Sequence, residues 1–117
     1  MTVGFIGLGK MGSQMVSRLI AAGHKVVVAD HNQAAVDAAV AGGAQAAANR
    51  QEIARALGTP AVVWLMIPAG HVDDEVDALQ LALPPGSIIV DGGNSDFRLT
   101  KQRATRCEQS GMQLVDV

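Results

Sequence analysis

The hexapeptide GLGKMG, residues 7–12, follows a short apolar run and precedes a stretch in which apolar residues recur with helical spacing. Each glycine has a physical role at such a strand–helix junction. Gly7 permits a tight turn, Gly9 lets a phosphate group approach the backbone, and Gly12 lets the helix pack closely on the strand. The N–H groups of the first helical turn then face outward, where they attract anions. The residues expected to contact a ligand here are Gly7, Leu8, Gly9, Lys10, Met11 and Gly12.

An acidic residue about 20 positions further on completes the pattern of a dinucleotide-binding loop. Asp30 ends a second β-branched run, residues 25–29, and its carboxylate can accept hydrogen bonds from both ribose hydroxyls of NAD. The same carboxylate would repel the 2′-phosphate of NADP. His31 and Asn32, rather than an arginine, follow it, and both are expected near the cofactor. NAD is the expected cofactor, while NADP stays open because a protonated His31 can contact a 2′-phosphate.

Apolar runs and helical stretches alternate along the rest of the chain. Strands are expected at residues 3–6, 25–29, 44–48, 61–67, 87–90 and 112–117. Helices are expected at residues 11–22, 33–41, 50–57, from 73 onward, and near 97–109. This order predicts an α/β, Rossmann-type, doubly wound parallel sheet with strand order 3-2-1-4-5-6 and helices on both faces. We expect residues 1–117 to form one NAD(P)-binding domain, truncated at about the sixth strand.

Three helix starts carry recognisable signals. Asn32 is the expected N-cap of the helix at residues 33–41. Asn49, with Glu52 three residues further on, has the pattern of a capping box. The acidic residues 73–75 are expected to open the fourth helix, because negative charge stabilises a helix N-terminus.

Composition and charge exclude several classes of protein. Apolar residues make up 49% of the chain and charged residues 17%, which argues against disorder. The formal net charge is -2 and no basic stripe occurs, so no nucleic-acid partner is expected. The longest apolar run, residues 61–67, is too short to span a membrane, and no signal peptide is expected before the first strand. The lone Cys107 and the histidine spacing indicate no disulfide and no metal site, and the expected location is the cytoplasm.

Two further loops should lie beside the glycine loop at the carboxyl edge of the sheet. In this fold, ligands bind there at the switch between strands 1 and 4. The loop after the fourth strand should line the nicotinamide side, through Ile67, Pro68, Ala69 and His71. The loop after the fifth strand, DGGNS at residues 91–95, places the amide of Asn94 where nicotinamide would meet substrate. On the residues alone, a plain turn that caps the next helix is an equally good interpretation of this loop.

Three stretches of the chain carry a resemblance to a known family. Residues 4–12, GFIGLGKMG, resemble the opening of the β-hydroxyacid dehydrogenase superfamily. The DGGNS motif resembles the signature of the 6-phosphogluconate dehydrogenases within it, and is much more specific than the glycine loop. Residues 64–70, WLMIPAG, are similar to the matching loop of the shorter, often NAD-preferring bacterial branch. The resemblance covers the whole chain.

This resemblance implies oxidation of 6-phosphogluconate at C3 by a nicotinamide cofactor, followed by loss of carbon dioxide to give ribulose 5-phosphate, in the pentose phosphate pathway. It implies that Met11 and residues 67–69 contact the cofactor and that Asn94 lies between nicotinamide and substrate. The long branch has an arginine where Asp30 and His31 stand and a lysine at the position of Pro68, which weakens any expectation of NADP.

The resemblance also places the family's catalytic lysine and glutamate beyond the end of this chain, in a helical domain. Lys101 and Glu108 match neither position, so no catalytic residue is expected here. We expect a cofactor-binding fragment of a homo-oligomeric enzyme that acts on a sugar-acid phosphate, inactive alone. Because the chain stops inside an apolar strand, we also expect it to be marginally stable and to self-associate through the edge at residues 112–117.

Two other functions stay open. The chain could be a stand-alone, non-enzymatic NAD(H)-binding module. It could also come from another β-hydroxyacid dehydrogenase that acts on a smaller acid, although the DGGNS motif argues against this. A Rossmann methyltransferase is disfavoured by the complete G-x-G-x-x-G pattern.

Overall fold

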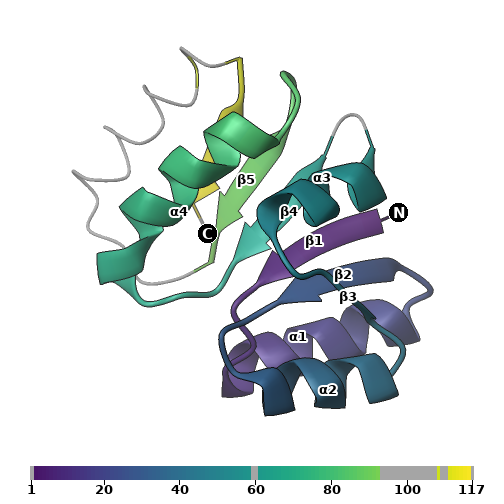
Figure 1. The fold of residues 1–117 in the computed structure, drawn as a ribbon. Helices are drawn as coiled ribbons and strands as arrows, with labels where there is room; N and C mark the ends of the chain where they lie inside the picture. The colour runs from purple at the N-terminus through teal and green to yellow at the C-terminus, as the bar shows by residue number, and fades with distance from the viewer. Residues whose placement is uncertain (1, 59–60, 93–107, 109–110, 117) are drawn as a thin grey trace.

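The computed structural model describes residues 2–58, 61–92, 108 and 111–116. Its six strands form one parallel sheet in the order β3-β2-β1-β4-β5-β6, which confirms the predicted Rossmann-type topology (Figure 1). The strands are β1 Thr2–Ile6, β2 Lys25–Ala29, β3 Gln45–Ala46, β4 Val62–Leu65, β5 Ile88–Asp91 and β6 Gln113–Asp116. The helices are α1 Lys10–Ala21, α2 Gln33–Ala41, α3 Arg50–Leu57 and α4 Ala69–Ala82.

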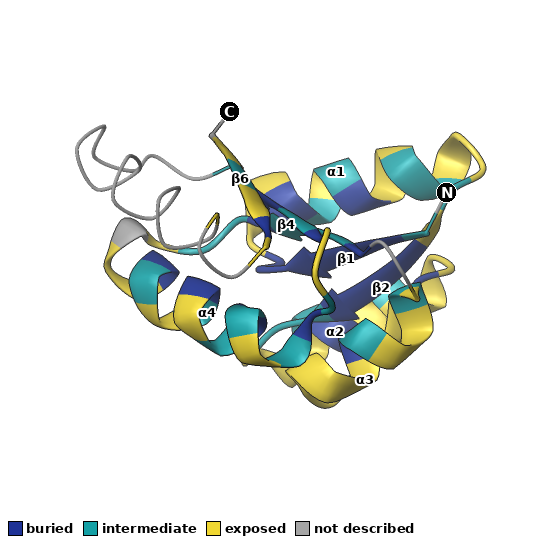
Figure 2. Cartoon of the chain, turned by 90° about the horizontal axis from the view of Figure 1, so that it is seen from above, coloured by how far each residue is buried: buried dark blue, intermediate teal, exposed yellow. Residues whose placement is uncertain are grey.

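The helices cover the two faces of the sheet in pairs. Helices α1 and α2 pack on one face, where Val16 and Val36 join Phe5 and Val28 of the strands in one apolar cluster. Helices α3 and α4 pack on the other face, where they contribute Ile53, Val72, Val76 and Leu79 to a second cluster. Figure 2 shows the central strands buried between yellow, exposed helix surfaces. Strands covered on both faces need apolar side chains in both directions, which explains their continuous β-branched runs.

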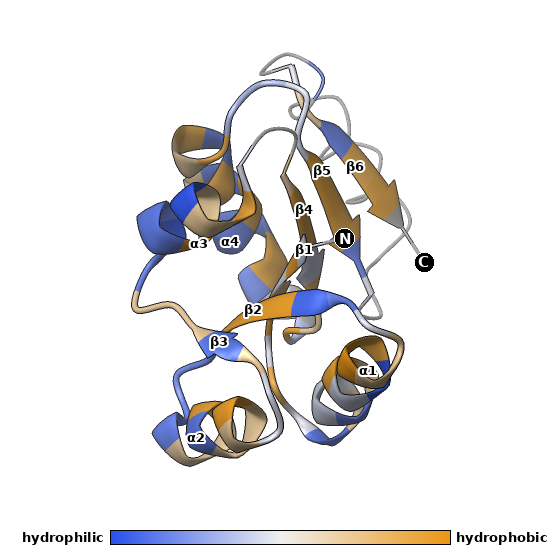
Figure 3. Ribbon diagram, turned by 90° about the vertical axis from the view of Figure 1, so that its right-hand side faces the viewer, coloured by the Kyte–Doolittle hydropathy of each residue, from blue (hydrophilic) through white to orange (hydrophobic). Residues whose placement is uncertain are grey.

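Strand β1 lies in the middle of the sheet. The chain adds β2 and β3 on one side of it, and β4, β5 and β6 on the other. Strand β1 pairs in parallel with β2 on one side and with β4 on the other, so that Phe5 lies opposite both Val28 and Trp64. The rings of Phe5 and Trp64 stack with their centroids 6.4 Å apart. In Figure 3, β2, β4, β5 and β6 are coloured mainly hydrophobic, whereas the outer surface of α3 is hydrophilic. The strand order reverses between β1 and β4, so a ligand crevice is expected at the carboxyl ends of these two strands.

The two predicted asparagine caps are confirmed. The side chain of Asn32 accepts hydrogen bonds from the N–H groups of Ala34 and Ala35 at the start of α2. Asn49 accepts one from the N–H group of Glu52 at the start of α3. The Glu52 carboxylate reaches back to the N–H group of Ala48, one residue before the cap, at 2.6 Å. Both helices therefore begin where local side-chain hydrogen bonds replace missing backbone partners.

The prediction that residues 73–75 open the fourth helix is wrong. Helix α4 begins at Ala69, and its first turn contains no acidic residue. Pro68 occupies the N-cap position, where its missing N–H group costs nothing and its ring restricts the backbone at the helix start. Proline thus sets this boundary, and the three acidic residues fall in the second turn.

Two predicted features lie wholly or largely outside the described residues. These are the loop that contains Asn94 and the polar helix near residues 97–109, of which only Glu108 is described. Within the described ranges, β6 forms one edge of the sheet and β3 the other. Of the helices in these ranges, none combines the length and the apolar character that crossing a membrane requires.

Candidate functional site

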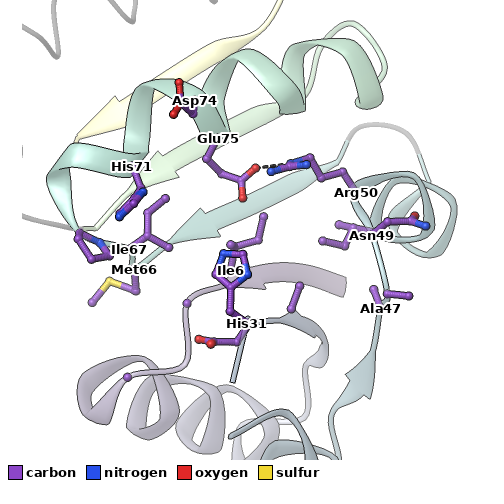
Figure 4. A pocket seen from close by; sticks show the side chains of 17 residues that line it. Ile6, His31, Ala47, Asn49, Arg50, Met66, Ile67, His71, Asp74 and Glu75 are labelled. Atoms are coloured by element: carbon purple, nitrogen blue, oxygen red, sulfur yellow. Dashed lines mark hydrogen bonds and ion pairs between the residues drawn. The ribbon is translucent and has the colours of Figure 1, made fainter. Parts of the chain in front are cut away.

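A cavity of about 800 Å³ opens at the carboxyl edge of the sheet (Figure 4). Its walls come from the ends of β1, β2 and β4, from the segment between β3 and α3, and from the first two turns of α4. Its volume lies within the range of roughly 300–1,000 Å³ that small-molecule sites occupy. The position is that of the ligand crevice in a doubly wound sheet.

The three glycines of the hexapeptide meet different surroundings. Gly7 has a φ of 102°, and a Cβ there would overlap the carbonyl oxygen of Met66. A Cβ on Gly12 would overlap the carbonyl oxygen of Gly7. Gly9, by contrast, has no atom within 4 Å of the place where its Cβ would stand, and it lines the cavity. The fold therefore requires Gly7 and Gly12, whereas the open space at Gly9 suits the approach of a ligand to the backbone.

Helix α1 begins without a side-chain cap. Its N-cap residue is Gly9, which has no side chain that could accept a hydrogen bond from the first turn. Helices α2 and α3, by contrast, are each capped by an asparagine. The first N–H groups of an α-helix have no partner within the helix, and they lie at the positive end of its dipole. An uncapped first turn beside the cavity is therefore able to bind the diphosphate of a dinucleotide.

Asp30 is held in place by the backbone around it. One carboxylate oxygen accepts a hydrogen bond of 2.5 Å from the N–H group of Leu8, and the other accepts one of 2.8 Å from the N–H group of Asn32. The carboxylate thus connects the end of β2 to the glycine loop while it lines the cavity. Because a carboxylate has about four acceptor positions, Asp30 can still accept hydrogen bonds from two hydroxyl groups.

The structure adds residues that the sequence analysis did not predict. Arg50 at the start of α3 and Glu75 in the second turn of α4 both line the cavity and form an ion pair through Nε and Oε2. Asp74 lines it as well. One signal could have pointed to Arg50: it follows the third strand, and ligands bind beyond the carboxyl ends of the strands in this fold.

The charge around the cavity is unbalanced. Three carboxylates, those of Asp30, Asp74 and Glu75, stand among the described lining residues, against the single guanidinium of Arg50. The guanidinium of Arg50 is also already paired with the carboxylate of Glu75. A ligand that carries a further phosphate on this wall would meet more negative than positive charge.

Comparisons with known proteins agree with this geometry. Residues 2–117 match the family described as the NAD binding domain of 6-phosphogluconate dehydrogenase. The chain belongs to this family. The NAD(+)-dependent, decarboxylating 6-phosphogluconate dehydrogenase of Haloferax volcanii is 43% identical over 108 residues, which are 92% of this chain and 36% of that protein. The decarboxylating 6-phosphogluconate dehydrogenase of Haemophilus ducreyi is 34% identical, over 97% of this chain and 25% of that protein.

A solved structure has the same fold as this chain. The 3-hydroxyisobutyrate dehydrogenase of Mycobacterium tuberculosis superposes with a TM-score of 0.86 and 28% identity, over 98% of this chain and 39% of that one. The chain therefore spans between a quarter and two-fifths of the length of these relatives. This part of the 6-phosphogluconate dehydrogenase family is the NAD-binding domain.

The cavity of this NAD-binding domain brings together about half of the predicted cofactor residues. Those that line it are Gly7, Gly9, Asp30, His31, Ile67, Pro68 and His71. Five others stand outside the lining: Leu8 and Gly12 are buried, and Lys10, Met11 and Asn32 are exposed. The side chain of Ala69 and all of Asn94 lie outside what the structure describes.

Proposed function

We propose that this domain binds NAD in preference to NADP, as the cofactor domain of an enzyme that oxidises and decarboxylates 6-phosphogluconate. The observation that carries the proposal is the carboxylate of Asp30, which lines the cavity and is held there by two backbone N–H groups. A carboxylate in this place accepts hydrogen bonds from the ribose hydroxyls of NAD and repels the 2′-phosphate of NADP. The name of the Haloferax relative, which is 43% identical, supports the same preference.

Different parts of the site would bind different parts of the cofactor. The first turn of α1 and the backbone at Gly9 would bind the diphosphate. Asp30 would hold the adenosine ribose, with His31 and Asn32 beside it. The loop of Ile67, Pro68, Ala69 and His71 would border the nicotinamide, with Met11 and Asn94 as further contacts. Bound NAD supplies the acceptor for a hydride, and the residues of this chain bind and orient it.

The activity of a longer protein is the second part of the proposal. We propose 6-phosphogluconate, a sugar-acid phosphate, as its substrate and ribulose 5-phosphate as its product, in a cytoplasmic homo-oligomer. The names of the curated relatives support this substrate. No residue of this chain is proposed as a catalytic acid or base, so residues 1–117 should act as one domain that binds the cofactor without turnover.

Titration calorimetry with NAD and with NADP tests the cofactor proposal. The unmodified chain should bind NAD more tightly. Asp30→Ala should weaken NAD binding about 10- to 100-fold, since a hydrogen bond to a charged group contributes about 1.5–3 kcal/mol. The preference for NAD should disappear in the same variant.

A matched control is Asp37→Asn, which removes a carboxylate from the exposed surface of α2, outside the cavity lining. This variant should bind NAD as the unmodified chain does. Tighter binding of NADP by the unmodified chain would contradict the preference, and binding of neither cofactor would contradict the proposal as a whole.

A further inference from the structure

The ion pair between Arg50 and Glu75 joins two walls of the cavity. Arg50 is the first residue of α3, and Glu75 reaches it from the second turn of α4, 25 positions further along the chain. Figure 4 shows the two side chains pointing toward each other from opposite helices. The Glu75 side chain is only 14% exposed, and that of Arg50 is 44% exposed. Glu75 is therefore the more fixed partner, and Arg50 is the one that a ligand can reach.

The pair lies on the side of the cavity where the adenosine half of a dinucleotide would bind. In a doubly wound sheet this half extends from the first helix over the ends of the second and third strands. Asp30 and His31 follow β2, and Ala48 and Asn49 lead from β3 into Arg50, and all of them line the same cavity. Arg50 is the only lysine or arginine among the described lining residues.

A 2′-phosphate on the ribose would need a cation to compensate for its repulsion by Asp30. A guanidinium is well suited to this, because its planar set of N–H donors matches the oxygens of a phosphate. Glu75 already uses the Nε–H of Arg50 and offsets its charge. An incoming 2′-phosphate would therefore have to compete with a carboxylate that is held close by and largely buried.

We propose that Glu75 sets the cofactor preference of this domain, by keeping Arg50 paired and turned toward α4. In this proposal Asp30 selects for the ribose hydroxyl. Glu75 keeps Arg50 in an ion pair, so that Arg50 does not bind a 2′-phosphate. Glu75 is a specificity-determining residue that acts through Arg50. The inference rests on the proposed binding of NAD in this cavity.

Fluorescence titration with NADH and NADPH tests this inference. Trp64 is the only tryptophan of the chain, so energy transfer from it to the reduced nicotinamide reports binding of either cofactor. Glu75→Gln should raise the affinity for NADPH about tenfold relative to NADH, the change expected from one charge-assisted hydrogen bond. Glu75→Ala should do the same, and it also removes the amide oxygen that a glutamine could still offer to Arg50.

Two variants separate the release of Arg50 from a general loss of negative charge. Arg50→Gln in the Glu75→Gln background should return the ratio of NADPH to NADH affinity to that of the unmodified chain. Asp74→Asn removes one carboxylate from the same helix and the same cavity wall, yet leaves the ion pair intact, so it should change the ratio less than threefold.

The outcomes distinguish this inference from the proposed function. If the unmodified chain binds NADH, and the Glu75 variants bind it as well with an unchanged ratio, Glu75 does not set the preference. The same conclusion follows if the gain in NADPH affinity persists without Arg50, or if Asp74→Asn reproduces it. Failure of the unmodified chain to bind NADH would overturn the proposed function and the inference together.

Discussion

The glycines of the hexapeptide can be separated by what surrounds each one. Alanine at position 7 would need a φ of 102° and would overlap the carbonyl oxygen of Met66. We expect Gly7→Ala to lower the free energy of unfolding by about 2 kcal/mol or more, since left-handed strain and a steric overlap combine there. Gly9 has a φ of -64°, which any residue adopts, and open space around it. Gly9→Ala should cost less than about 1 kcal/mol.

Gly9→Ala should have a small effect on stability but a large effect on the affinity for the cofactor. A methyl group there would stand where the diphosphate approaches the first turn of α1, so NADH should bind at least tenfold more weakly to Gly9→Ala. Urea unfolding and NADH titration of the same preparations measure both effects. Equal losses of stability in Gly7→Ala and Gly9→Ala would show that the fold needs both glycines, and that Gly9 is not reserved for a ligand.

Asn32 offers a test at the scale of an element, because it was predicted both as a helix cap and as a cofactor contact. Its side chain accepts hydrogen bonds from two N–H groups of α2, and it stands outside the cavity lining. Asn32→Ala should therefore lower the free energy of unfolding by about 1 kcal/mol. Asn32→Asp, which keeps an oxygen at the cap, should lose less. A variant of unchanged stability that binds NADH much more weakly would assign Asn32 to the cofactor instead.

The boundaries of the elements show which signals in a sequence are local. The second and third helices begin at the predicted residues, because Asn32 and Asn49 cap N–H groups a few positions away. Helix α4 begins four positions before its predicted start. Two local preferences competed there, and the backbone restriction of Pro68 outweighed the favourable but small effect of acidic residues in a first turn.

At the scale of the whole molecule, the strand order followed from the glycine loop and the alternation of elements, because parallel strands with short connections allow few topologies. The ion pair of Arg50 with Glu75 could not be predicted in this way. It forms between residues 25 positions apart, and only the packing of α3 beside α4 brings them together. The sequence places Asp30 beside the glycine loop, but the two hydrogen bonds that its carboxylate accepts from the backbone depend on how the loop folds.

The cavity lies between the two halves of the sheet, so a bound dinucleotide should stabilise the molecule as a whole. It is lined by the end of β2 and by α3 on one side, and by the segment after β4 and by α4 on the other. NADH at 100 times its dissociation constant should contribute about 2.7 kcal/mol, which raises the Tm of a domain of this size by roughly 10 °C.

ADP provides the control for this last prediction, because it carries the adenosine and the diphosphate but no nicotinamide. Hydrogen exchange should show protection of the first turn of α1 with either ligand, and protection of the loop between β4 and α4 with NADH alone. Equal protection by both ligands would mean that the nicotinamide half does not reach this loop. Saturating NADH that leaves the Tm unchanged would show that the cavity is not a site for the cofactor, since a ligand that binds only the folded state must raise its stability.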